Sequence, residues 1–242
     1  ALAMKNLHQQ VLELLPQCIE DRRWLHRHAE LSFREYKTAD YLEQALCELE
    51  GLELSRPTPT SVMAVLRTGR PGRCLAIRAD IDALPIQEAE NMSPRSKVPG
   101  VMHACGHDVH GTINVGAAKI LSEMKDQFSG SIYFFIQPAE EILKGAKLFL
   151  NDPEIDFDQI DAVAALHISA ELDAGTIGVR YGAILASADE VRIRINGKGG
   201  HGAHCHTLRD PVVAASAVVG ALQTLVSRET NPANAVVISI CT

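Results

Sequence analysis

The apolar run at residues 131–136, SIYFFI, most constrains what this chain can fold into. It shows no polar alternation, which is typical of a strand buried on both faces of a sheet. Residues 74–79 and 162–166 form two further apolar strand segments, and residues 111–124 carry apolar side chains at helical spacing. Buried strands interleaved with helices predict an α/β fold.

Polar side chains follow each of these three strands. Asp80 and Asp82 come after residues 74–79, Glu140 and Glu141 after residues 131–136, and His167 after residues 162–166. Taken singly, each has an ordinary explanation, because acids favour helix N-termini and a lone histidine is commonly a hydrogen-bonded loop residue. Since ligands gather at the carboxyl ends of strands in α/β sheets, the recurrence favours one shared site.

The segment VMHACGHDVH, residues 101–110, holds the densest set of metal-binding side chains. Thiolate, imidazole and carboxylate are ligands that borderline divalent metals prefer, so the segment predicts a metal site. A catalytic pair of thiol and imidazole is less favoured, because residues two apart on a loop rarely face each other as nucleophile and base must. The candidates in the segment are Cys105, His107 and Asp108, with His103 and His110 beside them.

A hydrolytic metal site needs protein ligands, an open position for water and a base. Glu140 is adjacent to a predicted ligand but free itself, which suits a general base acting through bound water. Asp82 is placed to orient a ligand imidazole from behind. The predicted protein ligands are Cys105, His107, Glu141 and His167.

Two amphipathic helices are predicted before the first strand. Apolar side chains recur at helical spacing over residues 7–25, with a break expected near Pro16, and again over residues 38–49. His26 and His28 are expected to form a polar helix end rather than part of a site.

The pattern of the sequence changes after residue 184. Residues 191–195 alternate like a half-exposed antiparallel strand, and an apolar helix over 211–227 and a strand over 236–240 follow. Because the chain ends within that last strand, we expect the second domain to continue beyond Thr242. We therefore predict two domains, at residues 1–184 and 185–242, the second of the α+β class.

A glycine-rich loop at residues 197–202 carries His201 in the second domain. It lacks the terminal Lys-Ser/Thr pair and the spacing of a nucleotide-binding P-loop. A second metal site is a less favoured interpretation of its neighbourhood, which contains His201, His204, Cys205 and His206.

Charge and composition limit the partners. A net charge of −7 argues against nucleic acid or an anionic membrane surface, since either needs clustered lysine and arginine. The six cysteines include no C-x-x-C motif, which indicates reduced thiols in a cytoplasmic protein. The apolar run Pro211–Val226 is interrupted by polar residues and falls short of a clean membrane span. A small-molecule partner is easiest to accommodate.

Eight short segments, in chain order, resemble the metal-dependent amidohydrolase branch of the aminoacylase and carboxypeptidase family. They are HRHAELSF, LAIRADIDALPI, VPGVMHACGHD, FIQPAEE, ALH, GTI, ASAD and GKGGH, within residues 20–242. The branch includes hippurate hydrolase, N-acyl amino acid deacylases and indoleacetyl amino acid hydrolases. The resemblance implies a mixed-sheet catalytic domain for two metals with an inserted ferredoxin-like α+β lid, both incomplete in this chain.

The resemblance also implies chemistry: two divalent metal ions per subunit (Mn, Zn, Co or Ni), hydrolysis of the amide bond of N-acyl amino acids, and a homodimer formed through the lid. Glu140 matches the family's general base and Asp82 the acid beside the site. His201 matches a lid histidine that helps bind substrate and polarise the scissile carbonyl, often across a dimer interface. The residues that match the metal ligands are Cys105, His107, Glu141 and His167.

Two features depart from the family pattern. Family chains carry one further histidine ligand beyond the point where this sequence stops, so we expect a continuation to supply it. The family often has an aromatic residue and prolines after the strand histidine, whereas Ile168 and Ser169 follow His167 here. The acyl pocket is therefore not predicted. The rival interpretation is a non-catalytic protein that keeps a metal or dimerises through a partial lid.

Overall fold

The computed structural model describes residues 2–184 and 187–241. They form two compact units, Ala1–Glu171 and Leu172–Thr242. Our predicted domain boundary between residues 184 and 185 stays a prediction. In chain order, the first unit contains α1 (Leu2–Arg27), α2 (Tyr36–Cys47), β1 (Leu52–Ser55), β2 (Val62–Arg67), β3 (Cys74–Asp80), α3 (His107–Glu123), η1 (Lys125–Gln127), β4 (Ser131–Gln137), α4 (Ala146–Leu150), η2 (Phe157–Gln159) and β5 (Ala162–Ala165).

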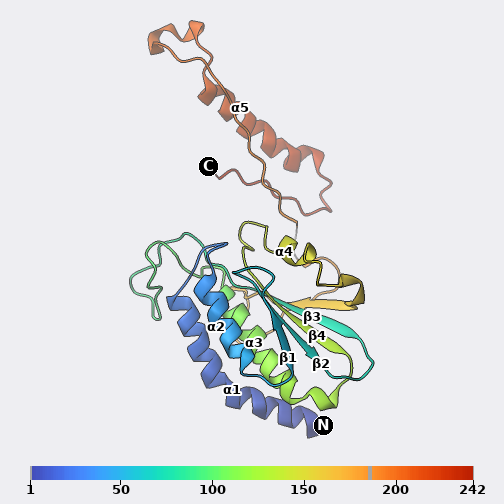
Figure 1. Cartoon of the computed structure of the whole chain (residues 1–242). Helices are drawn as coiled ribbons and strands as arrows, with labels where there is room; N and C mark the ends of the chain where they lie inside the picture. Colours follow the sequence, from blue (N-terminus) through green and yellow to red (C-terminus); the bar gives the residue numbers. More distant parts are fainter. Residues whose placement is uncertain (1, 185–186, 242) are drawn as a thin grey trace. The chain divides into compact units, whose positions relative to one another are not determined.

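A five-stranded mixed sheet forms the first unit's centre, in the order β1-β2-β4-β3-β5 (Figure 1). β3 pairs in parallel with both β4 and β5, whereas β1, β2 and β4 pair antiparallel. The carboxyl ends of β3, β4 and β5 therefore lie at one edge of the sheet, with Asp80 opposite Gln137. The predicted α/β class with a mixed sheet is confirmed.

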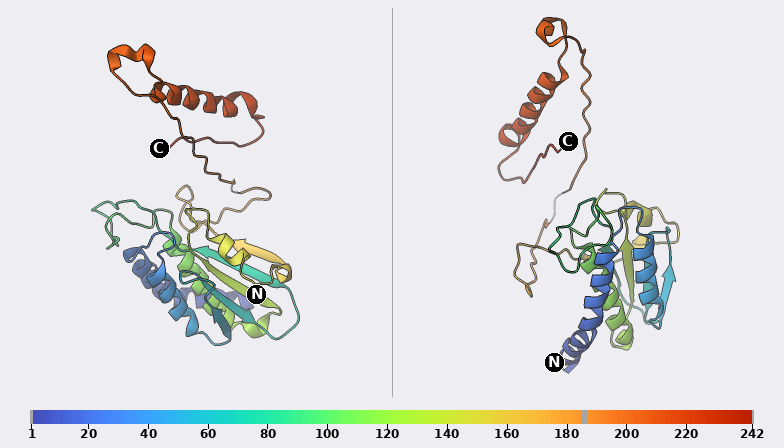
Figure 2. Two further views of the ribbon diagram at one scale, coloured as in Figure 1. Left: turned by 45° about the horizontal axis from the view of Figure 1, so that its top comes forward. Right: turned by 90° about the vertical axis from the view of Figure 1, so that its left-hand side faces the viewer.

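Alternate residues of the central strands face two separate apolar layers. On one face, Ile132, Phe134 and Ile136 of β4 pack against residues of α2 and α3. On the other, Phe135 packs against Phe149 of α4, in a cluster that also contains Tyr133. Burial on both faces explains why this strand is apolar throughout. Figure 2 shows the helices and the sheet of the first unit from two further directions.

The helix α1 packs against α3 and differs from expectation at Pro16. Pro16 lies inside one continuous 26-residue helix, so the predicted break is wrong. Pro16 is exposed, and the carbonyl group that its missing N–H leaves free can bind water. Packing of the flanking turns then keeps the helix intact.

Strand β3 forms as expected, and although β2 directly precedes it in the chain the two strands are not neighbours in the sheet. β4 lies between them, pairing antiparallel with β2 and parallel with β3. This arrangement brings the end of β4 beside the end of β3, which places the residues that follow each strand at one position.

The second unit contains η3 (Gly202–Thr207), α5 (Pro211–Thr224) and the π-helical turn η4 (Leu225–Glu229). The strands predicted at 191–195 and 236–240 are not formed. The pairing described in this unit is the isolated bridge between Lys198 and Arg209. A strand requires a hydrogen-bonded neighbour, and none of the described residues pairs with these two segments.

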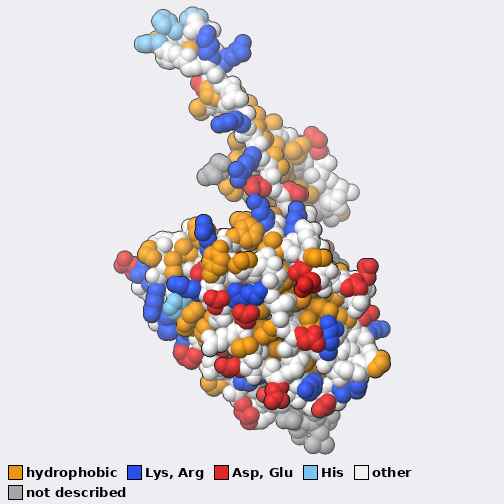
Figure 3. Space-filling model, viewed as in Figure 1, with side chains coloured by type: hydrophobic (Ala, Val, Ile, Leu, Met, Phe, Trp, Pro, Cys, Tyr) orange, Lys and Arg blue, Asp and Glu red, His pale blue; other side chains and the backbone are white. Residues whose placement is uncertain are grey.

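The predicted helix at 211–227 is confirmed by α5 and η4. Apolar side chains are exposed along it (Figure 3), including Val212, Val213 and Val219. By length and composition alone, Pro211–Glu229 is apolar enough to cross a membrane. One such helix is weak evidence for a membrane span, because helices of globular proteins pass the same criterion.

Candidate metal centre

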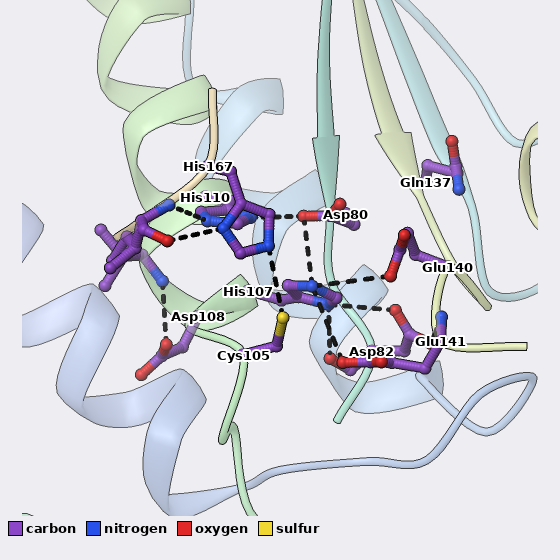
Figure 4. Close-up of polar contacts among 12 residues, drawn as sticks. Asp80, Asp82, Cys105, His107, Asp108, His110, Gln137, Glu140, Glu141 and His167 are labelled. Atoms are coloured by element: carbon purple, nitrogen blue, oxygen red, sulfur yellow. Dashed lines mark hydrogen bonds and ion pairs between the residues drawn. The ribbon is translucent and has the colours of Figure 1, made fainter. Parts of the chain in front are cut away.

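The candidate residues meet where three parallel strands end and one helix begins (Figure 4). His107 is the first residue of α3, not a loop residue as predicted, and Gly106 precedes it with a φ of 82°. Such a left-handed conformation is readily adopted by glycine. It turns the chain between Cys105 and His107, so that both side chains point to the carboxyl ends of the strands.

The imidazole of His107 lies at the centre of the site and is fully buried. Its Nδ1 lies 2.9 Å from the backbone oxygen of Asp82 and 3.2 Å from the carboxylate Oδ1 of the same residue. Both oxygens accept hydrogen bonds, so Nδ1 carries a proton and Nε2 is the ring nitrogen left to bind a metal.

The Nε2 atom of His107 has no hydrogen-bond partner among the described residues. Carboxylate oxygens of Asp80, Glu140 and Glu141 each lie 3.8 Å from it. That distance is too long for hydrogen bonds. It suits atoms that share one ion, because ligands about 2.0–2.2 Å from a metal lie roughly 3–4 Å apart.

Cys105 and His167 form the second part of the site. Sγ of Cys105 lies 3.3 Å from Nε2 of His167. Nδ1 of His167 lies 2.6 Å from the carbonyl oxygen of Ile168 and must donate to it, so Nε2 has the lone pair. Sγ of Cys105 and one ring nitrogen each of His107 and His167 lie within 4.8 Å of one another. The structure therefore brings the thiol and both imidazoles together.

The local charge favours a cation. Burial, with the negative charges of Glu141 and Glu140, raises the pKa of the Cys105 thiol to about 11. Burial likewise raises the pKa of Glu141, and the adjacent Glu140 adds to this shift. A divalent cation reverses both effects by stabilising thiolate and carboxylate. The donor set of sulfur, imidazole and carboxylate thus fits a borderline divalent metal.

Asp82 holds two parts of the site in place. Besides accepting from His107, its Oδ2 accepts hydrogen bonds from the Ser32 hydroxyl at 2.6 Å and from the Glu141 backbone N–H at 3.0 Å. Burial raises the pKa of Asp82, but the hydrogen bonds from His107 and Ser32 lower it overall. Asp82 therefore remains ionised and fixes the ring of His107.

His110 and Asp80 form an alternative ligand group with His107. Both nitrogens of His110 are already engaged, because Nδ1 hydrogen-bonds to Asp80 and Nε2 accepts from the Ile168 N–H at 3.0 Å. Burial raises the pKa of Asp80, but His110, His107 and Arg78 together lower it to about 2. His110 therefore ties β3 to the chain just after His167 and has no lone pair left for a metal.

Comparison with known proteins identifies the chain. Residues 76–240 match the sequence profile of Peptidase family M20/M25/M40. This chain belongs to that family. The resemblance to the amidohydrolase branch drawn from the sequence is thereby confirmed.

Individual M20 relatives cover most of the chain. An N-acyl-L-amino acid amidohydrolase of Geobacillus stearothermophilus is 44% identical over 239 residues, covering 99% of this chain and 64% of that protein. An N-acetyl-L-cysteine deacetylase of Bacillus subtilis is 41% identical, covering 93% of this chain and 53% of that protein. The chain thus spans well under two thirds of the latter and slightly under two thirds of the former.

A solved structure agrees. The YXEP protein of Bacillus subtilis, a dinuclear metal-binding peptidase from the M20 family, superimposes with a TM-score of 0.65 at 41% identity. The match covers 69% of this chain and 47% of that protein. Both the fold and metal binding as a family property are supported.

The M20 chain contains a second buried polar cluster that sequence reasoning missed. His26 is buried, with Nδ1 2.8 Å from Asp108 and Nε2 2.8 Å from Glu88. His26 does lie in the last turn of α1, as expected, but it is buried and bonded to two carboxylates. Asp108 also pairs with Arg22 at 2.8 Å, which gives it a hydrogen-bonding role behind the site. No local pattern predicts this cluster, because Glu88 and Asp108 lie 62 and 82 residues from His26.

His103 is buried beside this cluster, and neither ring nitrogen has a partner among the described residues. Burial lowers its pKa to about 4, so the ring is neutral. It belongs to none of the three ligand groups found in the described residues, all of which contain His107.

Three further histidines lie in the second unit of the M20 chain. His201 precedes η3, and its Nδ1 accepts a hydrogen bond from the Ala203 N–H at 3.2 Å. His204 and His206 lie nearby, but the described part of the second unit contains no group of three close ligand atoms. The less favoured second metal site gains no support.

Proposed function

We propose that this chain is the metal-binding part of an enzyme that hydrolyses the amide bond of N-acyl amino acids. The observation that carries the proposal is the unpartnered Nε2 of His107, which lies 3.8 Å from carboxylate oxygens of Glu140 and Glu141 while Asp82 holds Nδ1. Its M20 relatives include an N-acyl-L-amino acid amidohydrolase. The substrate class that we propose for this chain is inferred from that likeness.

Four side chains would hold two divalent ions, of Mn, Zn, Co or Ni. The ions would polarise the scissile carbonyl and lower the pKa of a bound water. Two groups of close ligand atoms share His107: one with Cys105 and His167, the other with Glu140 and Glu141. Asp82 and the Ile168 carbonyl orient the two imidazoles through their Nδ1 atoms. The proposed ligands are Cys105, His107, Glu141 and His167.

Glu140 and Glu141 are adjacent, and their exposure separates their roles. The Glu140 side chain is 32% exposed and that of Glu141 is 17% exposed. The more exposed Glu140 reaches the space where substrate and water arrive, which suits a general base. It would take a proton from the attacking water and pass it to the leaving amine as the carbon–nitrogen bond breaks. His201 would support the developing oxyanion.

The test uses the full-length protein with a panel of N-acyl amino acids after loading with Mn, Co, Ni or Zn. Release of free amino acid is measured for the wild type, for Glu140→Gln and for Glu154→Gln. Glu154 is an exposed glutamate outside the site, so its variant is the control. We expect turnover to fall by at least about a hundredfold in Glu140→Gln alone.

A chelator should abolish turnover in the wild type, and added metal should restore it. Release that persists in the chelated protein, or in Glu140→Gln, contradicts the proposal. Tight metal binding with no release from any member of the panel favours the rival, a protein that keeps the metal without catalysis.

We further propose that the second unit contributes a homodimer surface. The exposed valines of α5 support this, because an apolar helix face in water gains stability from a covering partner. Light scattering of the wild type and of Val212→Asp/Val213→Asp tests it, with a dimer expected for the former and a monomer for the latter.

A cytoplasmic location is proposed because all six cysteines lie in the described residues as free thiols. Detection of the full-length protein outside the cytoplasmic fraction of cells contradicts it.

A further inference from the structure

We propose that Glu35 is a positioning residue that fixes Ala139 and, through it, the glutamate pair at 140 and 141. The inference rests on the function proposed above for that pair. Glu35 touches neither the proposed ligands nor the substrate space; its effect passes through the backbone.

The backbone before the glutamate pair has an unfavourable conformation. Ala139 has a φ of 52°, in the left-handed region that residues with a side chain adopt at a cost. Ala139 is also fully buried, so its amide cannot turn to water for a partner. Such a conformation persists only where the surroundings hold it.

Glu35 makes the contact that stabilises this conformation. Its Oε1 accepts a hydrogen bond from the Ala139 N–H at 2.8 Å, across 104 residues of sequence. The carboxyl group is fully buried. Its other oxygen, Oε2, has no partner among the described residues. Burying such a group is unfavourable, so fold stability alone does not account for a glutamate here.

A role in helix capping does not account for Glu35 either. It is the N-cap residue of α2, yet its side chain makes no capping hydrogen bond. The side chain points instead to the loop after β4. The carboxyl therefore serves the glutamate loop and not the helix that begins beside it.

The loop after Ala139 closes on itself. The Ala139 carbonyl accepts from the N–H groups of Lys144 and Gly145, and the Glu140 carbonyl accepts from Leu143. Two bonds then connect this closed loop to the N-terminal half of the unit: Ala139 N–H to Glu35, and Glu141 N–H to Asp82 at 3.0 Å. These anchors are two residues apart and enclose Glu140, so loss of the Glu35 anchor frees one side of the pair.

The experiment compares Glu35→Gln, which keeps an acceptor oxygen at the same reach, with Glu35→Met, which has similar length and no acceptor. Glu35→Asp retains the carboxylate but is one methylene too short. Glu30→Met is the matched control, because Glu30 accepts from Thr38 in the same segment, away from Ala139. Each variant of the full-length protein is titrated with Co²⁺ by calorimetry, and kcat and KM are measured with the best substrate of the panel.

We expect Glu35→Gln and Glu30→Met to bind Co²⁺ within about threefold of the wild type. Glu35→Met and Glu35→Asp should bind roughly tenfold or more weakly, the scale seen when groups that orient ligands are removed. In the same two variants kcat should fall by a similar factor with KM little changed. Adding Ala139→Gly should recover part of the loss in Glu35→Met, since glycine adopts a φ of 52° without an anchor.

Equal Co²⁺ affinity and equal kcat in Glu35→Gln and Glu35→Met overturn the proposal, as does a loss of the same size in Glu30→Met. If Glu35→Met does not fold, Glu35→Asp decides by the same two measurements. Measuring Co²⁺ affinity requires no turnover. A protein that hydrolyses nothing would therefore contradict the proposed function, while Co²⁺ affinity would still decide the role of Glu35.

Discussion

The ring of His107 is held from behind by Asp82, with Nδ1 2.9 Å from the backbone oxygen of Asp82 and 3.2 Å from its carboxylate. One residue thus accepts the ring proton with two oxygens, while its second carboxylate oxygen accepts from the backbone of Glu141. The orientation of an imidazole and the position of a carboxylate are coupled through one side chain. The affinity for a metal bound by both groups should therefore depend on Asp82.

Replacing Asp82 by asparagine should weaken metal binding by roughly 10–100-fold. The amide would place an NH₂ group against the Ser32 hydroxyl or the Glu141 N–H, or against His107 Nδ1–H, so one favourable contact is lost in either orientation. Calorimetric titration with Co²⁺ or Zn²⁺ measures the change. Asp126→Asn, at a carboxylate whose side chain is 85% exposed, serves as the control and should bind like the wild type. Unchanged affinity in Asp82→Asn would exclude the orienting role.

Cys105 should be unreactive in the metal-free protein at pH 8. Burial and the charges of Glu141 and Glu140 raise its pKa to about 11, and only the thiolate is alkylated. Its rate with iodoacetamide should therefore rise about tenfold per pH unit between pH 8 and 10, as mass spectrometry of the Cys105 peptide can measure. Glu141→Gln should speed the reaction at pH 8 by removing a negative charge. A rate that levels off below pH 9 would contradict this.

Gly106→Ala and Gly69→Ala should have similar costs in stability but different effects on the site. Both glycines have a positive φ, of 82° and 70°, and alanine there costs about 1–2 kcal/mol. A Cβ on Gly69 meets open space, whereas one on Gly106 lies 3.2 Å from the Ile168 side chain, between two proposed ligands. The midpoint temperature of thermal unfolding should fall in both variants, whereas metal affinity should fall only in Gly106→Ala. Equal affinities would show that the turn does not position the ligands.

Glu35 should make the fold less stable as the pH rises. Burial raises its pKa from 4.5 to about 7 in the folded protein. The stability that this shift contributes is full below pH 4.5 and is lost as the pH rises through 7. Glutamine at position 35 cannot ionise, so the unfolding free energy of Glu35→Gln, relative to that of the wild type, should increase by about 3 kcal/mol between pH 4.5 and 8. Urea unfolding of the metal-free proteins measures this difference, and a pH-independent difference would contradict it.

The sequence predicted the site residues that follow apolar strands. Asp82, Glu141 and His167 each come after such a segment, and parallel strands place their carboxyl ends at one edge of the sheet. The ligand cluster around Cys105 was visible because its side chains are close in sequence. Their individual roles stay predictions until metal binding is measured.

The supporting residues could not be predicted in this way. Glu35, Ser32 and His26 bond to partners 104, 50 and 82 residues away. A polar residue near a helix end has the same local pattern whether it faces solvent or a buried partner. The insertion of β4 between β2 and β3 likewise leaves no local signal, since strand pairing depends on contacts between distant segments. The unpaired segments at 191–195 and 236–240 show the converse, because alternation indicates a strand only where a partner is available.

The most direct test of the account is the metal content of the full-length protein with His107→Ala and His110→Ala. Both residues lie in the first helical turns of α3 and both are buried, yet only His107 has a free ring nitrogen facing carboxylates. After dialysis against Zn²⁺ and then buffer, elemental analysis should find that His107→Ala has lost the ions that the wild type keeps. His110→Ala should keep at least part of them. Full metal content in His107→Ala, with loss in His110→Ala alone, would contradict the account.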